Sequence, residues 1–169
     1  MIETYIRDIP NFPKEGIIFK DITPLLNNVA ARNEVLKNII KNIPDVKIDK
    51  VIGVESRGFF FGILLAQELN AGFVPVRKKG KLPFDTVSAS YELEYGTDIL
   101  EIHTDAIKKG ENILIHDDVL ATGGTIKAVT ELVEILGGNI IQLNFLMELE
   151  FLKGREKIKN YNTYSILKY

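Results

Sequence analysis

The apolar residues of the segment 29–43 recur at helical spacing, and Pro44 follows them directly. Such spacing gathers them on one face of a helix, and a proline ends the pattern. We therefore predict an amphipathic helix over 29–43. Two further helices are predicted, over about 59–70 and over 125–136, and a Gly-Gly pair ends the second one.

Short apolar runs bounded by turn residues predict four strands, at 50–54, 72–76, 112–116 and 139–147. The segments 90–94 and 98–103 behave differently, because apolar and polar residues alternate in both. A Tyr-Gly-Thr turn separates them, which is typical of an antiparallel ribbon.

Strands and helices alternate along most of the chain, which predicts an α/β fold with a central, mostly parallel sheet flanked by helices on both faces. In such folds, ligands bind beyond the carboxyl ends of the strands. Three loops converge there, 55–58, 77–89 and 117–125. The loop 77–89 is polar and basic and contains Gly80 and Pro83, so we expect it to be long and mobile.

The chain has 169 residues, which predicts a single domain, residues 1–169, with one substantial core. A composition of 46% hydrophobic and 26% charged residues is ordinary for a globular protein, and a net charge of −2 gives no reason to expect nucleic-acid binding. The absence of cysteine excludes disulfides and thiolate chemistry, and two histidines cannot form a metal cage. No secretory signal or membrane-length apolar stretch is found, so a cytoplasmic enzyme with no membrane partner is expected.

Residues 113–125, Ile-Leu-Ile-His-Asp-Asp-Val-Leu-Ala-Thr-Gly-Gly-Thr, carry the strongest functional signal. The apolar run ends in Asp117 and Asp118, which a reference pKa near 3.9 leaves ionised at neutral pH, so they can accept hydrogen bonds from vicinal sugar hydroxyls. Backbone N–H groups freed by glycine, threonine hydroxyls and a helix dipole can bind the dianionic phosphate. This string predicts a ribose-phosphate site.

Each half of this string has a simpler interpretation. Asp-Asp after a strand can be an acidic start of a helix, and Thr-Gly-Gly-Thr an ordinary loop, but the joined string favours a site. Neither a Walker loop nor a G-x-G-x-x-G fingerprint occurs. A Ser-His-Asp hydrolase using His116 or His103 is discounted, because the G-x-S-x-G elbow is absent. We expect His116 to be a structural histidine with satisfied partners.

The acidic string resembles the phosphoribosyl-pyrophosphate signature of type I phosphoribosyltransferases. Other blocks resemble adenine phosphoribosyltransferases nearly end to end: 11–26, 55–59, 76–83, 91–96, 100–105 and 152–155. The resemblance implies the type I phosphoribosyltransferase fold with a small hood, to which residues 1–30 contribute, and a flexible loop. It also implies a homodimer. The implied reaction is purine salvage, a transfer of the phosphoribosyl group from phosphoribosyl pyrophosphate to N9 of adenine that yields AMP and pyrophosphate.

The resemblance also implies a role for each part of the site. Asp117 and Asp118 hold the ribose hydroxyls, and the 5′-phosphate is bound by Ala121, Thr122, Gly123, Gly124 and Thr125. Pyrophosphate is bound by the turn Glu55, Ser56, Arg57 and Gly58 together with Arg77, Lys78 and Lys81. We expect a strained backbone in that turn, with a cis non-proline peptide near Glu55–Ser56.

Glu94 matches the catalytic glutamate of the family, which manages a proton on the purine ring, and Arg57 joins it as a catalytic residue that clamps the leaving pyrophosphate. Adenine is expected against Ile18, Phe19, Lys20 and Leu149. Mg²⁺ is the implied cofactor. We expect no protein metal ligands, because Mg²⁺ is held mainly by substrate oxygens and water.

Two other functions remain open. A 6-oxopurine phosphoribosyltransferase is disfavoured by Ala121, because the corresponding residue in hypoxanthine-guanine enzymes is an acid, and by the block around Glu94. A regulator that senses phosphoribosyl pyrophosphate and binds nucleic acid would need a basic face or an added domain, and neither the length nor the net charge supplies one.

Overall fold

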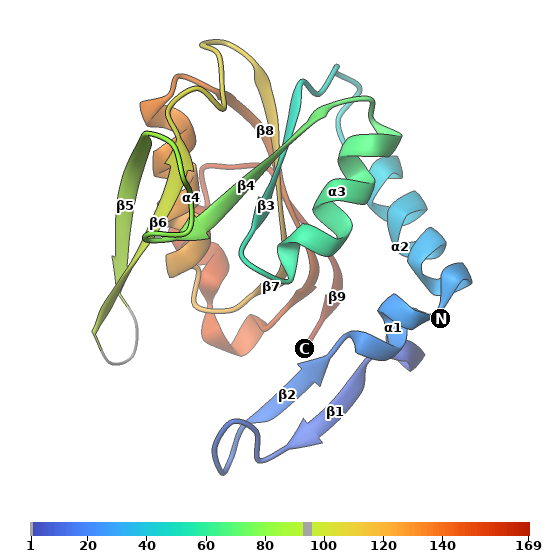
Figure 1. Ribbon diagram of the computed structural model, residues 1–169. Coiled ribbons are helices and arrows are strands. Elements are labelled where there is room, and N and C mark those ends of the chain that lie inside the picture. The colour runs from blue at the N-terminus through green and yellow to red at the C-terminus, as the bar shows by residue number, and fades with distance from the viewer. Residues whose placement is uncertain (1, 93–95) are drawn as a thin grey trace. The chain divides into compact units, whose positions relative to one another are not determined.

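The computed structural model describes residues 2–92 and 96–169 (Figure 1). The chain forms two compact units, residues 1–41 and residues 42–169, and each is described by itself. None of the described helices is both long and apolar enough to cross a membrane.

The N-terminal unit holds an antiparallel hairpin and two α-helices. Its elements are η1 (Ile2–Tyr5), β1 (Arg7–Pro10), β2 (Ile18–Asp21), α1 (Thr23–Asn27) and α2 (Val29–Lys41). The predicted helix 29–43 is confirmed as α2, which begins after Asn28, whose side chain accepts a hydrogen bond from the Ala31 N–H at 2.9 Å. The hairpin and α1 were not predicted.

The second unit is built on a seven-stranded sheet with the strand order β5-β6-β4-β3-β7-β8-β9. Its strands are β3 (Lys50–Val54), β4 (Gly72–Lys78), β5 (Thr86–Glu92), β6 (Thr97–His103), β7 (Asn112–Leu120), β8 (Asn139–Glu148) and β9 (Thr163–Lys168). The five strands from β4 to β9 are parallel, whereas β6 pairs antiparallel with both β4 and β5. The predicted mostly parallel sheet is confirmed.

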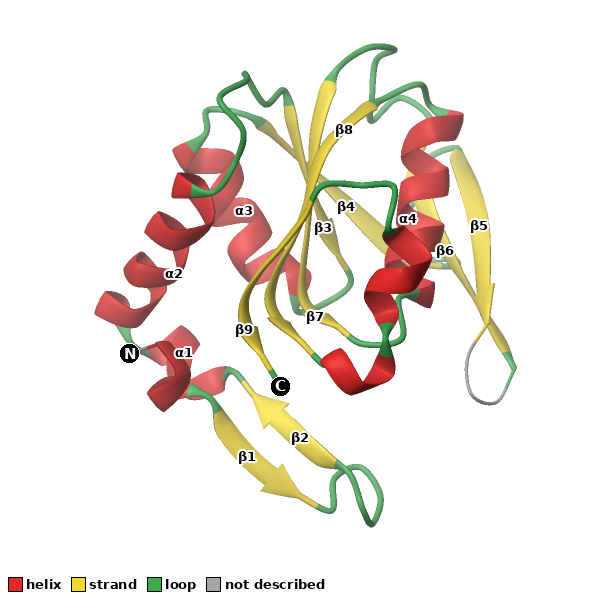
Figure 2. Cartoon of the chain, turned by 180° about the vertical axis from the view of Figure 1, so that it is seen from behind, coloured by secondary structure: helices red, strands yellow, loops and turns green. Residues whose placement is uncertain are grey.

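Two helices cover opposite faces of this sheet, α3 (Gly58–Glu68) and α4 (Gly124–Ile135) (Figures 1 and 2). The β3-α3-β4 and β7-α4-β8 crossovers run in opposite directions along the sheet, and the right-handed crossovers usual in proteins then place their helices on opposite faces. The carboxyl ends of β3 and β7 therefore lie side by side at the point where the strand order reverses. Two short helices, η2 (Glu150–Leu152) and η3 (Gly154–Ile158), follow β8.

The main hydrophobic core is shared by the sheet and α4. Fully buried side chains from the central strands, such as Ile52, Ile115 and Phe145, pack there with Val129 and Leu132 of α4. Such burial stabilises the fold by roughly 1.5–3 kcal/mol for each large side chain. The core fixes the strand ends, and with them the loops that follow.

Two predicted boundaries were wrong. The strand predicted over 112–116 continues to Leu120, because Asp117 and Val119 still pair with Phe145 and Met147 of β8. The loop predicted over 77–89 is only 79–85, because β4 extends to Lys78 and β5 begins at Thr86. The antiparallel ribbon is confirmed, although residues 93–95 lie outside the described part of the chain.

Candidate functional site

The turn between β3 and α3 carries the first predicted group of site residues. Its Glu55–Ser56 peptide is cis, which confirms the prediction for this turn. The Glu55 carboxylate accepts a hydrogen bond from the Lys78 N–H at 2.7 Å and another from Arg77 Nη2 at 3.2 Å. Burial raises the pKa of Glu55, but these hydrogen bonds outweigh it and the pKa is lowered overall. Glu55 therefore stays ionised and ties the turn to the end of β4.

Arg77 and Lys78 do not lie on a mobile loop, which corrects the prediction for this cluster. Both are in β4 and both are paired, Arg77 with Glu55 and Lys78 with Asp98, whose carboxylate lies 3.0 Å from Lys78 Nζ. The hydrogen bond and charge of Asp98 raise the pKa of Lys78. Of the three residues in the predicted cluster, Arg77, Lys78 and Lys81, the loop 79–85 holds Lys81 alone. Sequence reasoning missed the pairs because their acids are distant in the chain.

Gly58 brings the first turn of α3 against β7. A Cβ atom at Gly58 would lie 2.9 Å from the His116 carbonyl oxygen and 3.0 Å from Asp117 Oδ1, which is too close. The helix that follows the first loop therefore begins beside the acidic pair. The start of α3 has no side-chain cap hydrogen bond.

The acidic pair, Asp117 and Asp118, lies near the end of β7, close to the turn 55–58. Asp117 lines a small cavity with residues 119–123, 125 and 126, and its Oδ1 accepts the Asp118 N–H at 2.9 Å. Asp118 is buried, and its Oδ2 lies 2.7 Å from Arg57 Nε in an ion pair, without a well-aligned hydrogen bond. The structure thus brings Asp117, Asp118 and Arg57 together.

The protonation of this pair differs from the expectation of two ordinary carboxylates. Burial raises the pKa of Asp117 well above its usual value, and the neighbouring charge of Asp118 raises it further. Burial also raises the pKa of Asp118, although the Arg57 charge opposes this. The pair therefore keeps a proton to higher pH than two isolated aspartates do. A ligand that needs both carboxylates ionised must displace this proton.

The loop after β7 has the backbone geometry of an anion site. Gly123 adopts a left-handed conformation with φ of 80°, and α4 begins at Gly124 without a side-chain cap hydrogen bond. Thr125 and Ile126 of its first turn line the cavity beyond β7, and the start of a helix carries the positive end of its dipole. The cavity is about 60 Å³, so it holds a small group rather than a whole substrate; its lining is Asp117, Val119, Leu120, Ala121, Thr122, Gly123, Thr125 and Ile126.

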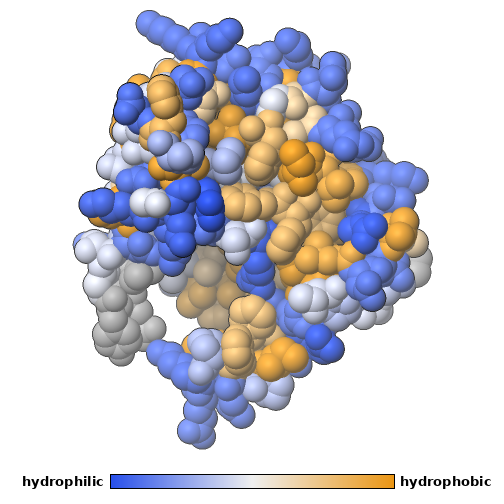
Figure 3. Space-filling model, in the orientation of Figure 1, coloured by the Kyte–Doolittle hydropathy of each residue, from blue (hydrophilic) through white to orange (hydrophobic). Residues whose placement is uncertain are grey.

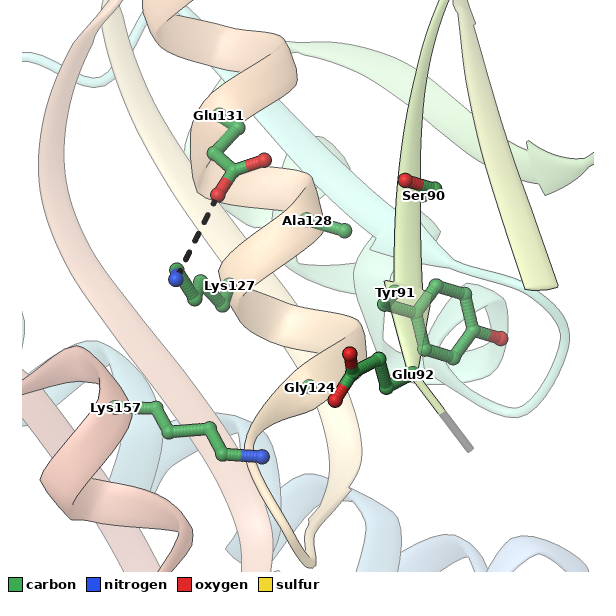
Figure 4. A pocket seen from close by; sticks show the side chains of 8 residues that line it. All are labelled: Ser90, Tyr91, Glu92, Gly124, Lys127, Ala128, Glu131 and Lys157. Atoms are coloured by element: carbon green, nitrogen blue, oxygen red, sulfur yellow. Dashed lines mark ion pairs between the residues drawn. The ribbon is translucent and has the colours of Figure 1, made fainter. Parts of the chain in front are cut away.

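A larger cavity of about 300 Å³ lies between β5 and α4 (Figure 4). Lys127 and Glu131 lie one turn apart on α4 with their charges 3.9 Å apart, and the exposed Lys157 of η3 reaches toward Gly124. Glu92 at the end of β5 points to the same place. Acidic and basic groups balance here, so the lining indicates no particular ligand.

The predicted adenine residues belong to different units. Ile18, Phe19 and Lys20 are in β2, where Phe19 packs edge to face on Phe12 with ring centroids 5.2 Å apart and Lys20 pairs with Asp8 at 2.7 Å. Leu149 follows β8 and is half-buried. Their common site remains a prediction. Glu94 lies outside the described residues, so its predicted role is also untested.

His116 is a structural residue, buried in β7. Its Nδ1 lies 2.6 Å from Asn144 Oδ1, and its ring packs edge to face on Phe61. Its Nε2 has no partner among the described residues, so it is satisfied on one nitrogen rather than on both. Burial lowers the pKa of His116 to about 4, and the hydrogen bond with Asn144 opposes the shift only partly. The imidazole is neutral at physiological pH.

Within residues 2–92 and 96–169, no three His, Cys, Asp or Glu side chains cluster in a way that could hold a metal ion. At the end of β7, Asp117 and Asp118 offer two carboxyl groups, and burial raises the pKa of both. This donor set suits a cation held mostly by a phosphorylated ligand and water.

The fold and the loops at the switch point define a phosphoribosyltransferase domain. The chain belongs to the phosphoribosyl transferase domain family, whose family model matches residues 20–167. The similarity is more specific than the family: an adenine phosphoribosyltransferase of Flavobacterium johnsoniae is 71% identical over 99% of both chains. This confirms the resemblance that the sequence blocks predicted.

Solved structures agree in fold and sequence. The adenine phosphoribosyltransferase of Thermoanaerobacter pseudethanolicus is 52% identical, with a TM-score of 0.96 over 99% of this chain and 98% of that one. The enzyme of Saccharomyces cerevisiae is 46% identical, with a TM-score of 0.92 over 97% and 95%, and was crystallised with adenine and an imino-altritol bisphosphate.

Proposed function

We propose that this protein is an adenine phosphoribosyltransferase, which transfers the phosphoribosyl group of phosphoribosyl pyrophosphate to N9 of adenine and so serves purine salvage. The observation that carries this proposal is the 71% identity to an enzyme of that name over 99% of both chains. The geometry of the second unit supports it, because Asp117 and Asp118 at the end of β7 lie close to Arg57 of the turn 55–58 and are followed by the glycine-containing loop 121–125.

In this function Asp117 and Asp118 bind the two ribose hydroxyls, and the loop 121–125 binds the 5′-phosphate. The uncapped start of α4 supports the second role, because its N–H groups are fixed in direction before the ligand arrives. Asp117 and Thr125 both line the small cavity, which supports the proposal that they bind the same ligand.

The turn 55–58 holds the pyrophosphate, and Arg57 stabilises its charge as the bond to the ribose carbon breaks. Arg57 is already held beside the ribose-binding pair by Asp118, 2.7 Å away. Arg77 and Lys78 contribute positive charge from fixed positions on β4, and Lys81 contributes from the loop. Catalysis of this kind consists mainly of positioning and electrostatic stabilisation.

Adenine binds against Ile18, Phe19, Lys20 and Leu149, and Glu94 manages the proton of its imidazole ring as N9 attacks. The yeast relative that was crystallised with adenine supports a base site of this kind. A backbone site that hydrogen-bonds the exocyclic amine rejects a 6-oxopurine, because a mismatched donor or acceptor is left unpaired at a cost of roughly 1–3 kcal/mol.

Mg²⁺ is the proposed cofactor, bound to the pyrophosphate of the substrate, where it neutralises part of the leaving group's charge. Substrate oxygens and water would hold the metal, and no described residue is proposed as its ligand. Asp117 and Asp118 hold the ribose so that the reacting carbon faces the purine.

We further propose a homodimer. Figure 3 shows apolar side chains gathered over α3, where Phe60 is 46% and Ile63 is 50% exposed. A helix that is apolar on all sides favours burial.

The whole chain acts as one enzyme domain, with residues 1–30 contributing the hood and the loop 79–85 closing over pyrophosphate. We place it in the cytoplasm, because its phosphorylated substrate is charged and does not cross membranes.

A steady-state assay with a panel of purines, with and without Mg²⁺, tests the function. We expect AMP and pyrophosphate to form from adenine and phosphoribosyl pyrophosphate only when Mg²⁺ is present. Preferential conversion of hypoxanthine would instead indicate a 6-oxopurine enzyme. The absence of pyrophosphate release with every purine would contradict the proposal.

A further inference from the structure

We propose that Gly154 and Arg155 are positioning residues for the ribose-phosphate substrate. They lie in the segment 149–158 that follows β8, and we infer that this segment, here called the brace, fixes the shape of the phosphate loop 121–125. The inference rests on the proposed function, because it concerns the affinity for the same substrate. Neither residue faces the small cavity of the phosphate loop.

Gly154 lies directly against the phosphate loop. A Cβ atom at Gly154 would overlap the Ala121 carbonyl oxygen and lie 2.9 Å from the Gly123 nitrogen. The reverse is also true, because a Cβ atom at Gly123 would overlap the Gly154 carbonyl oxygen and lie 3.1 Å from its Cα. Two backbones can approach so closely only without side chains between them. The loop therefore takes its shape against the brace.

Arg155 anchors the brace to the sheet. Its Nε and Nη2 donate to the two carboxylate oxygens of Glu148, at 2.9 and 2.5 Å, and its Nη1 donates to the Thr163 carbonyl oxygen at 3.0 Å. Glu148 is only 4% exposed and also accepts the Ser165 hydroxyl at 2.9 Å. The guanidinium thus joins the brace to the end of β8 and the start of β9, and it binds Glu148 in the bidentate geometry that only arginine provides.

The backbone supplies a third connection. The Leu149 N–H donates to the Leu120 carbonyl oxygen at 2.9 Å, which binds the start of the brace to the last residue of β7. The phosphate loop begins at the next residue, so the same segment holds the residue before the loop and contacts Ala121 and Gly123 within it. Backbone N–H groups bind an anion well only when their directions are fixed beforehand. Loss of the brace is therefore expected to weaken phosphate binding.

The experiment compares two probes that report on different loops. Ribose 5-phosphate reports on the phosphate loop, and inorganic pyrophosphate reports on the turn 55–58. Both dissociation constants are measured by titration calorimetry with Mg²⁺ for the unmodified protein, Gly154→Ala and Arg155→Lys. We expect Gly154→Ala to weaken ribose 5-phosphate binding by about tenfold or more. Arg155→Lys keeps the positive charge but cannot form the bidentate hydrogen bonds, so we expect ribose 5-phosphate to bind about threefold to tenfold more weakly. Pyrophosphate binding stays within about twofold for both.

Gly138→Ala is the matched control. It also adds one crowded methyl group, because its Cβ would lie 2.7 Å from Val133 Cγ1 and 2.9 Å from Ile113 Cγ1. Gly138 precedes β8, whose other end carries Glu148, so this variant lowers the unfolding temperature without touching the phosphate loop. Its ribose 5-phosphate binding is expected to remain normal.

The outcomes separate the two proposals. Unchanged ribose 5-phosphate binding in folded Gly154→Ala, or equal losses for both probes, would overturn the brace while leaving the enzyme's function intact. If Gly154→Ala does not fold, Arg155→Lys decides by the same criterion. An unmodified protein that forms no AMP from adenine overturns the proposed function, and the brace with it.

Discussion

Arg57 Nε lies 2.7 Å from Asp118 Oδ2, so an ion pair joins the turn after β3 to the end of β7. The Asp118 side chain is only 7% exposed, which makes its carboxylate dependent on this partner. In the proposed function the two residues bind different parts of one substrate, the pyrophosphate and the ribose. Each holds the other in place before the substrate arrives.

Asp118→Asn is expected to weaken the affinity for phosphoribosyl pyrophosphate by about 10- to 100-fold, because one charge-assisted hydrogen bond contributes roughly 1.5–3 kcal/mol. Stability should hardly change. Burial raises the pKa of Asp118, so the folded state disfavours its charge, which the amide removes. The KM for phosphoribosyl pyrophosphate and the thermal midpoint measure the two effects.

Asp49→Asn is the control for this prediction. Asp49 accepts the Asn112 N–H at 2.9 Å at the opposite end of β7, and this hydrogen bond lowers its pKa. Its substitution should reduce stability and leave the KM unchanged. A normal KM in Asp118→Asn would show that Asp118 does not bind the ribose.

The affinity for ribose 5-phosphate should rise with pH above the usual titration range of an aspartate. Burial and the charge of Asp118 raise the pKa of Asp117, and the sugar hydroxyls need an ionised acceptor, so binding releases a proton. Calorimetry in buffers of different ionisation enthalpy measures that release. Asp117→Asn should bind more weakly and release fewer protons. Because the ligand's own titration is common to both proteins, equal proton release would contradict the prediction.

The local sequence pattern predicted much of the sheet because the apolar strands of its core are continuous. The pattern did not predict the strand residues that are polar. Asp117 and Asp118 remain within β7 because β8 supplies backbone hydrogen-bond partners for this part of the strand. Arg77 and Lys78 likewise belong to β4, and the acids that pair with them come from other strands. Distance along the chain conceals such contacts.

The site shows the same division. The turn at 121–125 and the helix start after it could be predicted because glycines and hydroxyls have a local physical meaning there, while the phosphate role of this loop stays a prediction. The raised pKa of Asp117 could not, since burial depends on the packing of the whole sheet. The contact between Gly154 and Gly123 was also beyond reach, because nothing in two distant glycines indicates that their backbones meet.

The contribution of His116 to stability is predicted to fall as the pH is lowered from about 6.5 toward 4, whereas the raised pKa values of Asp117 and Asp118 act in the opposite direction. Burial lowers the pKa of His116 from 6.5 to about 4, so in this interval His116 binds more protons in the unfolded state than in the folded state. The loss is at most about 1.4 kcal/mol per pH unit. Urea unfolding at several pH values measures it. The double variant His116→Leu and Asn144→Leu removes the imidazole with its partner, and an unchanged pH dependence in that variant would show that other groups are responsible.

Glu94→Gln should lower turnover by about 10²- to 10⁴-fold, because a positioned proton acceptor contributes that much to a transfer of this kind. The KM for phosphoribosyl pyrophosphate should change little, since Glu94 is proposed to act on the purine and not on the ribose. Glu92→Gln is the matched control: Glu92 ends β5, is exposed, and lines the cavity beside α4. Initial rates at saturating substrate measure both variants. If Glu94→Gln turned over as fast as Glu92→Gln, the proton would have to be managed by another group.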